Sequence, residues 1–150
     1  MNGTSSGLVN GTLGTQISLE QSELSKIVSE IESNAMRKMP NCAYASTPAE
    51  KFTKYSLDYS NPNARGKAEA YEKGLGYTKH NASTLISQIH KYVTNGNAPY
   101  DVSQTIYGTK YKYRIPVVGP NGKTKNVIAV YQIDAGQVIP RLITNYLEGK

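Results

Sequence analysis

The sequence predicts an α+β fold in which N-terminal helices pack on a four-stranded antiparallel β-meander. Two observations predict this class. Helical spacing of apolar residues and helix-ending signals occur before residue 98, whereas residues 100–147 contain strand-forming runs divided by turn signals. The third predicted strand, TKNVIAVYQI, is apolar on both faces, so we expect it to be central in the sheet, with helices covering one side.

The first 50 residues predict a linker or entry segment with one amphipathic helix. Residues 1–15 are rich in Gly, Asn, Thr and Ser, so we expect them to be disordered. Ser18 and Gln21 have the spacing of a capping box, and Pro40 ends the helical pattern. We expect the apolar stripe to pack on its own chain, with binding to a delivery machine as the alternative. The stripe consists of Leu24, Ile27, Val28, Ile31 and Ala35.

Residues 51–150 predict a separate basic domain that follows a connector at residues 40–50. The alternation in KFTKYSLDY, residues 51–59, predicts a short strand or extended arm, and NPNARG predicts a turn after it. A short helix is expected over residues 67–73, ending at Gly74.

The remaining elements are a second helix and the sheet. The helix is expected to begin at Asn81, a good N-cap, and to end at NGN, residues 95–97. Gly108, GPNG and DAG are turn signals that divide the sheet. The predicted strands lie near residues 100–107, 109–118, 124–133 and 138–147.

The charge of the chain is concentrated in its second part. Residues 1–50 carry three cationic and five anionic side chains, whereas residues 51–150 carry 14 cationic and six anionic ones, a net charge of +8. Eleven of the 12 tyrosines lie in this basic part. Lysines displace counterions from phosphates and rings stack on bases, so a nucleic-acid binder is one interpretation. A basic soluble domain without such a partner is the other.

Composition and motifs exclude several classes of site. Cys42 is the single cysteine, so the chain has no intramolecular disulfide and no thiolate set for structural zinc. No apolar run approaches the about 20 residues of a membrane span, and the first residues lack a signal-peptide pattern, so we expect any export signal elsewhere. Gly74 and Gly76 lack the other residues of a phosphate-binding P-loop. We expect neither a metal nor another cofactor.

Scattered cationic and hydroxyl side chains suit metal-free RNA cleavage instead. That reaction needs a base for the 2′-hydroxyl, cations for the phosphate and an acid for the leaving oxygen, and the RNA supplies its own nucleophile. The candidates are Lys67, His80, His90, Lys110, Tyr111, Arg114, Arg141 and Thr144.

The stretch YGTKYKYRIP separates tyrosines from cations on the two faces of a predicted strand. We assign Tyr111 and Tyr113 to the half-buried face, with hydroxyls that reach the sheet edge. The other face then presents substrate-binding cations that follow phosphates: Lys110, Lys112 and Arg114. The reverse, with tyrosines stacking on bases, stays open.

A series of short motifs occurs between Arg65 and Tyr146, and the resemblance that they carry covers about residues 51–147. In order, the motifs are RGKAEAY, LGY, NASTL, YGTKY, PNGK, VIAVYQID and PRLITNY. Together they resemble a C-terminal toxin-tip domain of bacterial polymorphic toxins of the contact-dependent growth inhibition type. The order of helices and meander is also similar to the barnase, EndoU, colicin and RelE group of RNases, a fold that several such toxins use to cut tRNA.

The resemblance implies a metal-independent endoribonuclease that cleaves tRNA and leaves a 2′,3′-cyclic phosphate. It implies delivery as part of a larger secreted or cell-surface toxin, action in the target-cell cytoplasm, and an acidic immunity protein that covers the basic face in the producer. It leaves open whether a host translation factor presents the RNA. The alternatives are a non-catalytic nucleic-acid-binding module and a protein-interaction domain.

The resemblance also implies roles for single residues. Arg141, in the PRLIT motif, is expected to hold the scissile phosphate, with Thr144 as a hydroxyl donor. Strict alternation puts these two on opposite faces, so one shared site needs a twist or bulge near Pro140. Lys67, in the KA motif, is expected to contact phosphate.

Histidines are the natural candidates for proton transfer. His80 lies in the loop before the second helix of the domain and is the catalytic candidate. His90 lies beside an apolar stripe and is more simply interpreted as a packed or flanking residue. Tyr111 completes the predicted catalytic set.

Overall fold

The computed structural model describes residues 20–149 and divides the chain into two units, residues 1–36 and residues 37–150. The two units are described one at a time. The predicted disorder of residues 1–15 and the predicted capping box at Ser18 lie outside the described residues.

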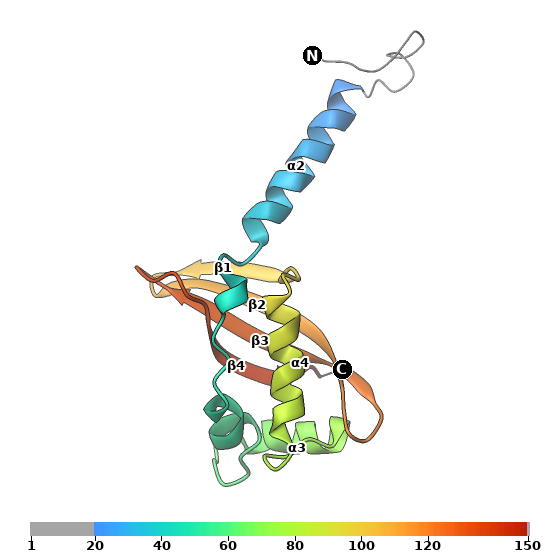
Figure 1. The fold of residues 1–150 in the computed structure, drawn as a ribbon, viewed down its shortest axis with the longest axis vertical. Coiled ribbons are helices and arrows are strands. Elements are labelled where there is room, and N and C mark those ends of the chain that lie inside the picture. Colours follow the sequence, from blue (N-terminus) through green and yellow to red (C-terminus); the bar gives the residue numbers. More distant parts are fainter. Residues whose placement is uncertain (1–19, 150) are drawn as a thin grey trace. The chain divides into compact units, whose positions relative to one another are not determined.

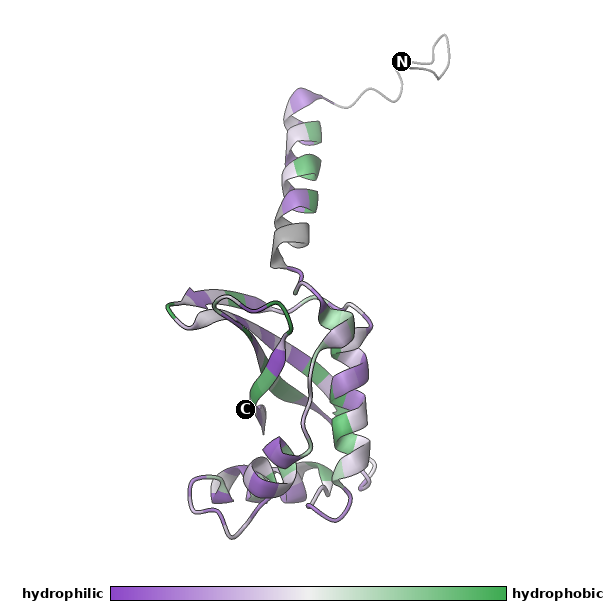
Figure 2. Cartoon of the chain, turned by 60° about the vertical axis from the view of Figure 1, so that its left-hand side comes forward, coloured by the Kyte–Doolittle hydropathy of each residue, from purple (hydrophilic) through white to green (hydrophobic). Residues whose placement is uncertain are grey.

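The first unit contains helix α2 (Gln21–Arg37), which confirms the predicted amphipathic helix. Figure 2 shows apolar residues as green patches at successive turns of this helix. Leu24, Ile27, Val28 and Ile31 are exposed. The expected packing of this stripe on its own chain stays a prediction. No helix within residues 20–149 combines the length and the apolarity that crossing a membrane requires.

The second unit contains a four-stranded antiparallel sheet in the order β1–β2–β3–β4, which confirms the predicted meander and the α+β class (Figure 1). The strands are β1 (Asp101–Thr105), β2 (Gly108–Val118), β3 (Thr124–Asp134) and β4 (Arg141–Leu147). As predicted, β3 is an inner strand and is buried over most of its length. β2 begins at Gly108, a position that requires glycine. Its φ is 144°, and a Cβ there would overlap the carbonyl oxygen of Ile133.

Two α-helices precede the sheet: α3 (Arg65–Leu75) and α4 (Ala82–Thr94). Both were predicted, but α3 is longer than predicted at both ends. Its C-cap is Gly76, with a φ of 87°, and not Gly74. Asn81 is the N-cap residue of α4, but its side chain bonds backwards, accepting from the Thr78 amide and donating to the Gly76 carbonyl.

The prediction of a strand or extended arm at residues 51–59 is wrong. The segment forms a short π-helix, η2 (Phe52–Ser56), in which the Leu57 amide donates to the Phe52 carbonyl at 2.8 Å. Phe52 and Ser56 are both buried, and their spacing of four is that of one helical face. The same two residues also fit a period of two, which is why alternation misassigned the segment.

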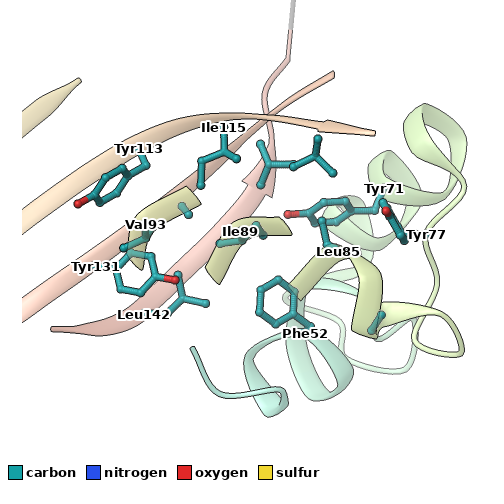
Figure 3. Packing of buried hydrophobic residues seen from close by; sticks show 14 of the residues in the cluster. Phe52, Tyr71, Tyr77, Leu85, Ile89, Val93, Tyr113, Ile115, Tyr131 and Leu142 are labelled. Carbon is teal, nitrogen blue, oxygen red and sulfur yellow. The ribbon is translucent and has the colours of Figure 1, made fainter. Parts of the chain in front are cut away.

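The helices cover one face of the sheet, and the core lies between them (Figure 3). Tyr113 and Tyr131 extend from the sheet towards α4, and their rings meet edge to face with centroids 5.9 Å apart. The main buried side chains from the helices are Phe52, Tyr71, Leu75, Leu85, Ile89 and Val93. The opposite face of the sheet carries Lys110, Lys112 and Arg114.

Candidate functional site

A β-bulge in β4 decides which face its predicted site residues occupy. Thr144 pairs with Val130 and Leu142 pairs with Tyr131, so Ile143 is an extra residue between them. Residues directly opposite each other in a sheet share a face. The bulge therefore brings Arg141 and Thr144 to the same face, as a shared site requires.

This face carries a row of cross-strand neighbours made of Lys112, Val130 and Thr144. A hollow of about 340 Å³, the face hollow, lies here. Val130 is buried although it lies on the face that carries Lys112 and Thr144. The hollow is lined by Asp101, Ser103, Lys110, Lys112, Val130, Ile143, Thr144 and Tyr146.

Lys67 reaches this strand from α3. Its Nζ donates a hydrogen bond to Thr144 Oγ1 at 3.0 Å and lies 5.7 Å from the ring centroid of Tyr146. Partial burial disfavours the charged amine and lowers the pKa of Lys67. Lys67 and Thr144 were both predicted for the site, and the structure brings them into contact.

A second hollow, of about 210 Å³, lies at the outer edge of β4. We call it the edge hollow. It is walled by η2, α3 and β4 and shares Ile143 and Thr144 with the face hollow, so Thr144 stands between the two. The residues that line it are Lys51, Tyr55, Ser56, Lys67, Ile143, Thr144 and Asn145.

The lysines of the two hollows differ from the neighbouring arginines in their charge partners. Within residues 20–149, no ion pair involves the four lysines Lys51, Lys67, Lys110 and Lys112. Among the described residues, the linings of the two hollows thus present positive charge with the carboxylate of Asp101 as the one acidic group.

Both arginines of this face are paired with carboxylates. Arg114 contacts both carboxylate oxygens of Glu148 at 3.1 and 2.9 Å. Arg141 contacts both oxygens of Asp134 at 2.7 and 3.0 Å, and these bonds lower the pKa of Asp134. Arg141 lines neither hollow.

The family described as "Domain of unknown function (DUF6883)" matches residues 38–149. The chain belongs to this family. The search of curated proteins gave no match.

A solved structure has a similar fold. It is a chain of the "Contact-dependent growth inhibition toxin - immunity protein complex from Klebsiella pneumoniae 342", with a TM-score of 0.53 and 16% sequence identity. The alignment covers 68% of this chain and 98% of that chain. At this identity the likeness shows that the DUF6883 domain shares the fold.

The DUF6883 fold does not bring Tyr111 or His80 to the two hollows. Tyr111 lies on the helix-covered face, 6% exposed, and burial raises its pKa. His80 is exposed in the loop between α3 and α4, where it lines a separate hollow with Asp58 and Glu72. The structure therefore does not bring Tyr111 or His80 into the hollows that Lys67 and Thr144 line, and the catalytic assignment of Tyr111 and His80 stays a prediction.

The prediction that the strand tyrosines extend their hydroxyls to the sheet edge is wrong for Tyr113. This hydroxyl is buried and has no hydrogen-bond partner among residues 20–149. The ring is enclosed between the edges of Tyr92 and Tyr131, with centroids 6.4 and 5.9 Å away, so the side chain ends inside the core.

The structure agrees with the interpretation of His90 as a packed or flanking residue. Its Nδ1 lies 2.9 Å from the Thr47 hydroxyl, which in turn lies 2.6 Å from the Tyr131 hydroxyl. This chain of hydrogen bonds joins α4 to the sheet through the connector, and His90 lines neither the face hollow nor the edge hollow.

Sequence reasoning missed Lys51 and Tyr55 as site residues. Both lie in the segment misassigned as a strand, and Lys51 Nζ lies 5.6 Å from the centroid of the Tyr55 ring. Their spacing of four is the signal that a helical interpretation would have used, because it puts the two side chains on one helical face.

Proposed function

We propose that the DUF6883 domain is a contact-dependent growth inhibition toxin that cleaves RNA without a metal ion, with tRNA as its substrate. The observation that carries this proposal is the contact between Lys67 and Thr144 at the junction of two hollows that hold four lysines without ion pairs. Such a cluster suits a phosphodiester, whose negative charge increases in the transition state of cleavage.

In the proposed reaction, the RNA binds with a phosphate beside Thr144. Lys110 and Lys112 stabilise the pentavalent phosphate, and the Thr144 hydroxyl donates to one of its oxygens. Burial lowers the pKa of Lys67 and so makes its neutral amine easier to form. This amine accepts the proton of the 2′-hydroxyl. The 2′-oxygen attacks the phosphorus, the 5′-oxygen leaves and takes a proton from the Lys67 ammonium, and the product is a 2′,3′-cyclic phosphate.

Arg141 has a supporting part in this proposal. It shares the face of Thr144, but its guanidinium is held by Asp134. A phosphate oxygen can replace one carboxylate oxygen as acceptor, because guanidinium binds both groups in the same forked geometry. Arg141 then adds a cation next to the substrate.

The biological role rests on the toxin resemblance and the charge. The solved structure with a similar fold is a complex of a toxin with an immunity protein. A net charge of +8 over residues 51–150 supports the toxin assignment and an acidic immunity protein as its inhibitor. We propose that a larger secreted or surface-displayed protein delivers the domain, which acts in the target-cell cytoplasm.

The test is to produce the whole chain in bacteria and to examine tRNA by denaturing electrophoresis, and then to incubate purified tRNA with the protein and excess chelator. The parent is expected to cleave, whereas Thr144→Val and Lys67→Ala lose roughly 100-fold or more in rate, as the loss of one transition-state donor typically does. Lys123→Ala, at an exposed hairpin turn, is the charge-matched control. Cleavage in cells without cleavage of purified tRNA would indicate that a host translation factor presents the RNA.

A non-catalytic nucleic-acid-binding module is the second candidate, because neither His80 nor His90 lines the two hollows. The same experiment separates the candidates. Intact tRNA both in cells and with purified protein, together with salt-dependent RNA binding, would reject the ribonuclease and support the binding module.

A further inference from the structure

We infer that the edge hollow binds a second nucleotide of a single-stranded RNA, with its phosphate at Lys51 and its base against the ring of Tyr55. This inference rests on the proposed function of the Thr144 site. It assigns a binding role to η2, which no part of the proposed cleavage step uses.

The walls of the edge hollow are fixed in place by buried contacts. Ser56 is buried, and its hydroxyl donates to the Lys51 carbonyl at 2.8 Å, which holds the start of η2. On the opposite wall, the Tyr71 hydroxyl donates to Asn145 Oδ1 at 2.8 Å in the interior. Buried hydrogen bonds on both walls therefore fix the shape of the edge hollow.

Lys51 and Tyr55 offer the two groups that a nucleotide needs. Lys51 has no ion pair within residues 20–149, so its ammonium is available to a phosphate. Tyr55 is 53% exposed, so its ring has surface on which a base can stack. Since every base has a π-face, this contact tolerates any sequence.

The position of the edge hollow matches the next nucleotide along a strand. It shares Ile143 and Thr144 with the face hollow, so an RNA with one phosphate at Thr144 has the edge hollow beside it for the next nucleotide. The outer edge of β4 is bridged by Ser46 at Arg141, before the bulge, which leaves the edge at Ile143 and Thr144 to the hollow.

The size of the edge hollow favours a single strand. Its volume of about 210 Å³ suits part of one nucleotide, and stacking on Tyr55 requires a base that is not stacked on both sides in a duplex. The substrate class is therefore RNA with unpaired nucleotides, such as a loop.

The experiment measures binding of 2′-O-methyl RNA, which lacks the 2′-hydroxyl nucleophile, to the whole chain by fluorescence anisotropy. A single-stranded dinucleotide and a single-stranded hexanucleotide are compared at several salt concentrations. Lys51→Ala and Tyr55→Ala are the test variants. Lys54→Ala, an exposed lysine of η2 outside the hollow, and Tyr44→Ala, an exposed tyrosine of the connector, are the matched controls.

Tyr55→Ala is expected to weaken hexanucleotide binding roughly 5-fold to 100-fold, the effect of losing one stacked base. Lys51→Ala is expected to lower the salt slope of hexanucleotide binding by about 0.7, the value for one phosphate contact on a single strand. Both variants should bind the dinucleotide like the parent, and both controls should bind the hexanucleotide like the parent. Circular dichroism checks the fold of each variant.

Equal hexanucleotide binding by the parent, Lys51→Ala and Tyr55→Ala would overturn the inference, and so would an equal loss in Lys51→Ala and Lys54→Ala. Failure of the proposed function looks different. If tRNA stays intact both in cells and with purified protein while hexanucleotide binding depends on Lys51 and Tyr55, the nucleotide site stands and the ribonuclease is rejected.

Discussion

At the scale of single residues, Lys67 has the most specific environment in the site. It is partly buried, bonded to Thr144 and without a carboxylate partner in the described part of the chain. Burial without a compensating charge favours the neutral amine, which is the form that accepts a proton.

The lowered pKa of Lys67 predicts its reactivity. Because burial lowers the pKa of Lys67 in the folded protein, reaction with an acylating reagent should reach its half-maximal rate below the ordinary lysine pKa of 10.5. Mass spectrometry of the peptide that contains Lys67, over a pH series, measures this midpoint. Denatured protein is the control and should show the ordinary value. A midpoint at or above 10.5 in the folded protein would contradict the assignment.

Two buried tyrosines predict opposite effects of the same substitution. Tyr113→Phe removes a hydroxyl that has no partner, so it should raise the free energy of unfolding by about 1 kcal/mol. Tyr71→Phe leaves the side-chain oxygen of buried Asn145 without its donor, so it should lower that free energy by about 1–3 kcal/mol. Urea unfolding measures both, and destabilisation by Tyr113→Phe would show that its hydroxyl has a partner after all.

The ion pair between Asp134 and Arg141 predicts a pH dependence. The pKa of Asp134 is lowered, so its contribution to stability is present above the ordinary value of 3.8 and is lost as the pH falls through the lowered pKa. The difference in urea midpoint between the parent and Asp134→Asn should therefore shrink as the pH falls below 3.8. A difference that does not change with pH would mean that the ion pair has no effect on stability.

The ion pair between Asp134 and Arg141 also allows a test of the proposed contact between Arg141 and phosphate. Asp134→Asn removes the charge that competes with phosphate, so RNA should bind more tightly if Arg141 contacts it. Fluorescence anisotropy at low salt measures the change. Unchanged affinity would remove Arg141 from the site.

At the scale of elements, the sequence predicted the four strands, the helices and the central place of β3, because turn residues and apolar periodicity are local signals. It misassigned η2, because a spacing of four residues also fits a period of two. The position of the β4 bulge was not predictable, since the extra residue, Ile143, differs in no way from an ordinary strand residue. The segment of η2 contributes Lys51 and Tyr55 to the candidate site, and the bulge sets which face each β4 side chain occupies. The candidate site was therefore predicted less completely than the fold.

The bulge in β4 predicts the effect of a deletion. Without Ile143, Leu142 and Thr144 become consecutive and keep their partners Tyr131 and Val130, so the ladder becomes regular and the protein should stay folded. Ile143 lines both hollows, and its loss changes how they join. RNA cleavage should fall about 10-fold or more while circular dichroism is unchanged. Ile143→Ala, which keeps the bulge, is the control, and full activity of the deletion variant would show that the bulge is not needed.

At the scale of the whole molecule, uncompensated charge predicts salt-dependent binding. Lys51, Lys110 and Lys112 have no ion pair within residues 20–149, and each is proposed to contact one phosphate of a single strand. Three such contacts give a slope of about −2 for the logarithm of the association constant against the logarithm of salt concentration. Binding of single-stranded RNA by the whole chain between low and physiological salt measures it. Affinity that does not change with salt would favour the protein-interaction domain.

The chain order of Lys51, Lys67 and Thr144 has a consequence for delivery. Lys51 is the N-cap residue of η2, whereas Lys67 lies in α3 and Thr144 in β4. Lys67 and Thr144 are 77 positions apart in the sequence, so no short fragment contains the candidate site. Under the proposed function, we therefore expect an extended chain in transit to have no cleavage activity, because its site is not assembled. The proposed activity would begin only when the last strand joins the sheet.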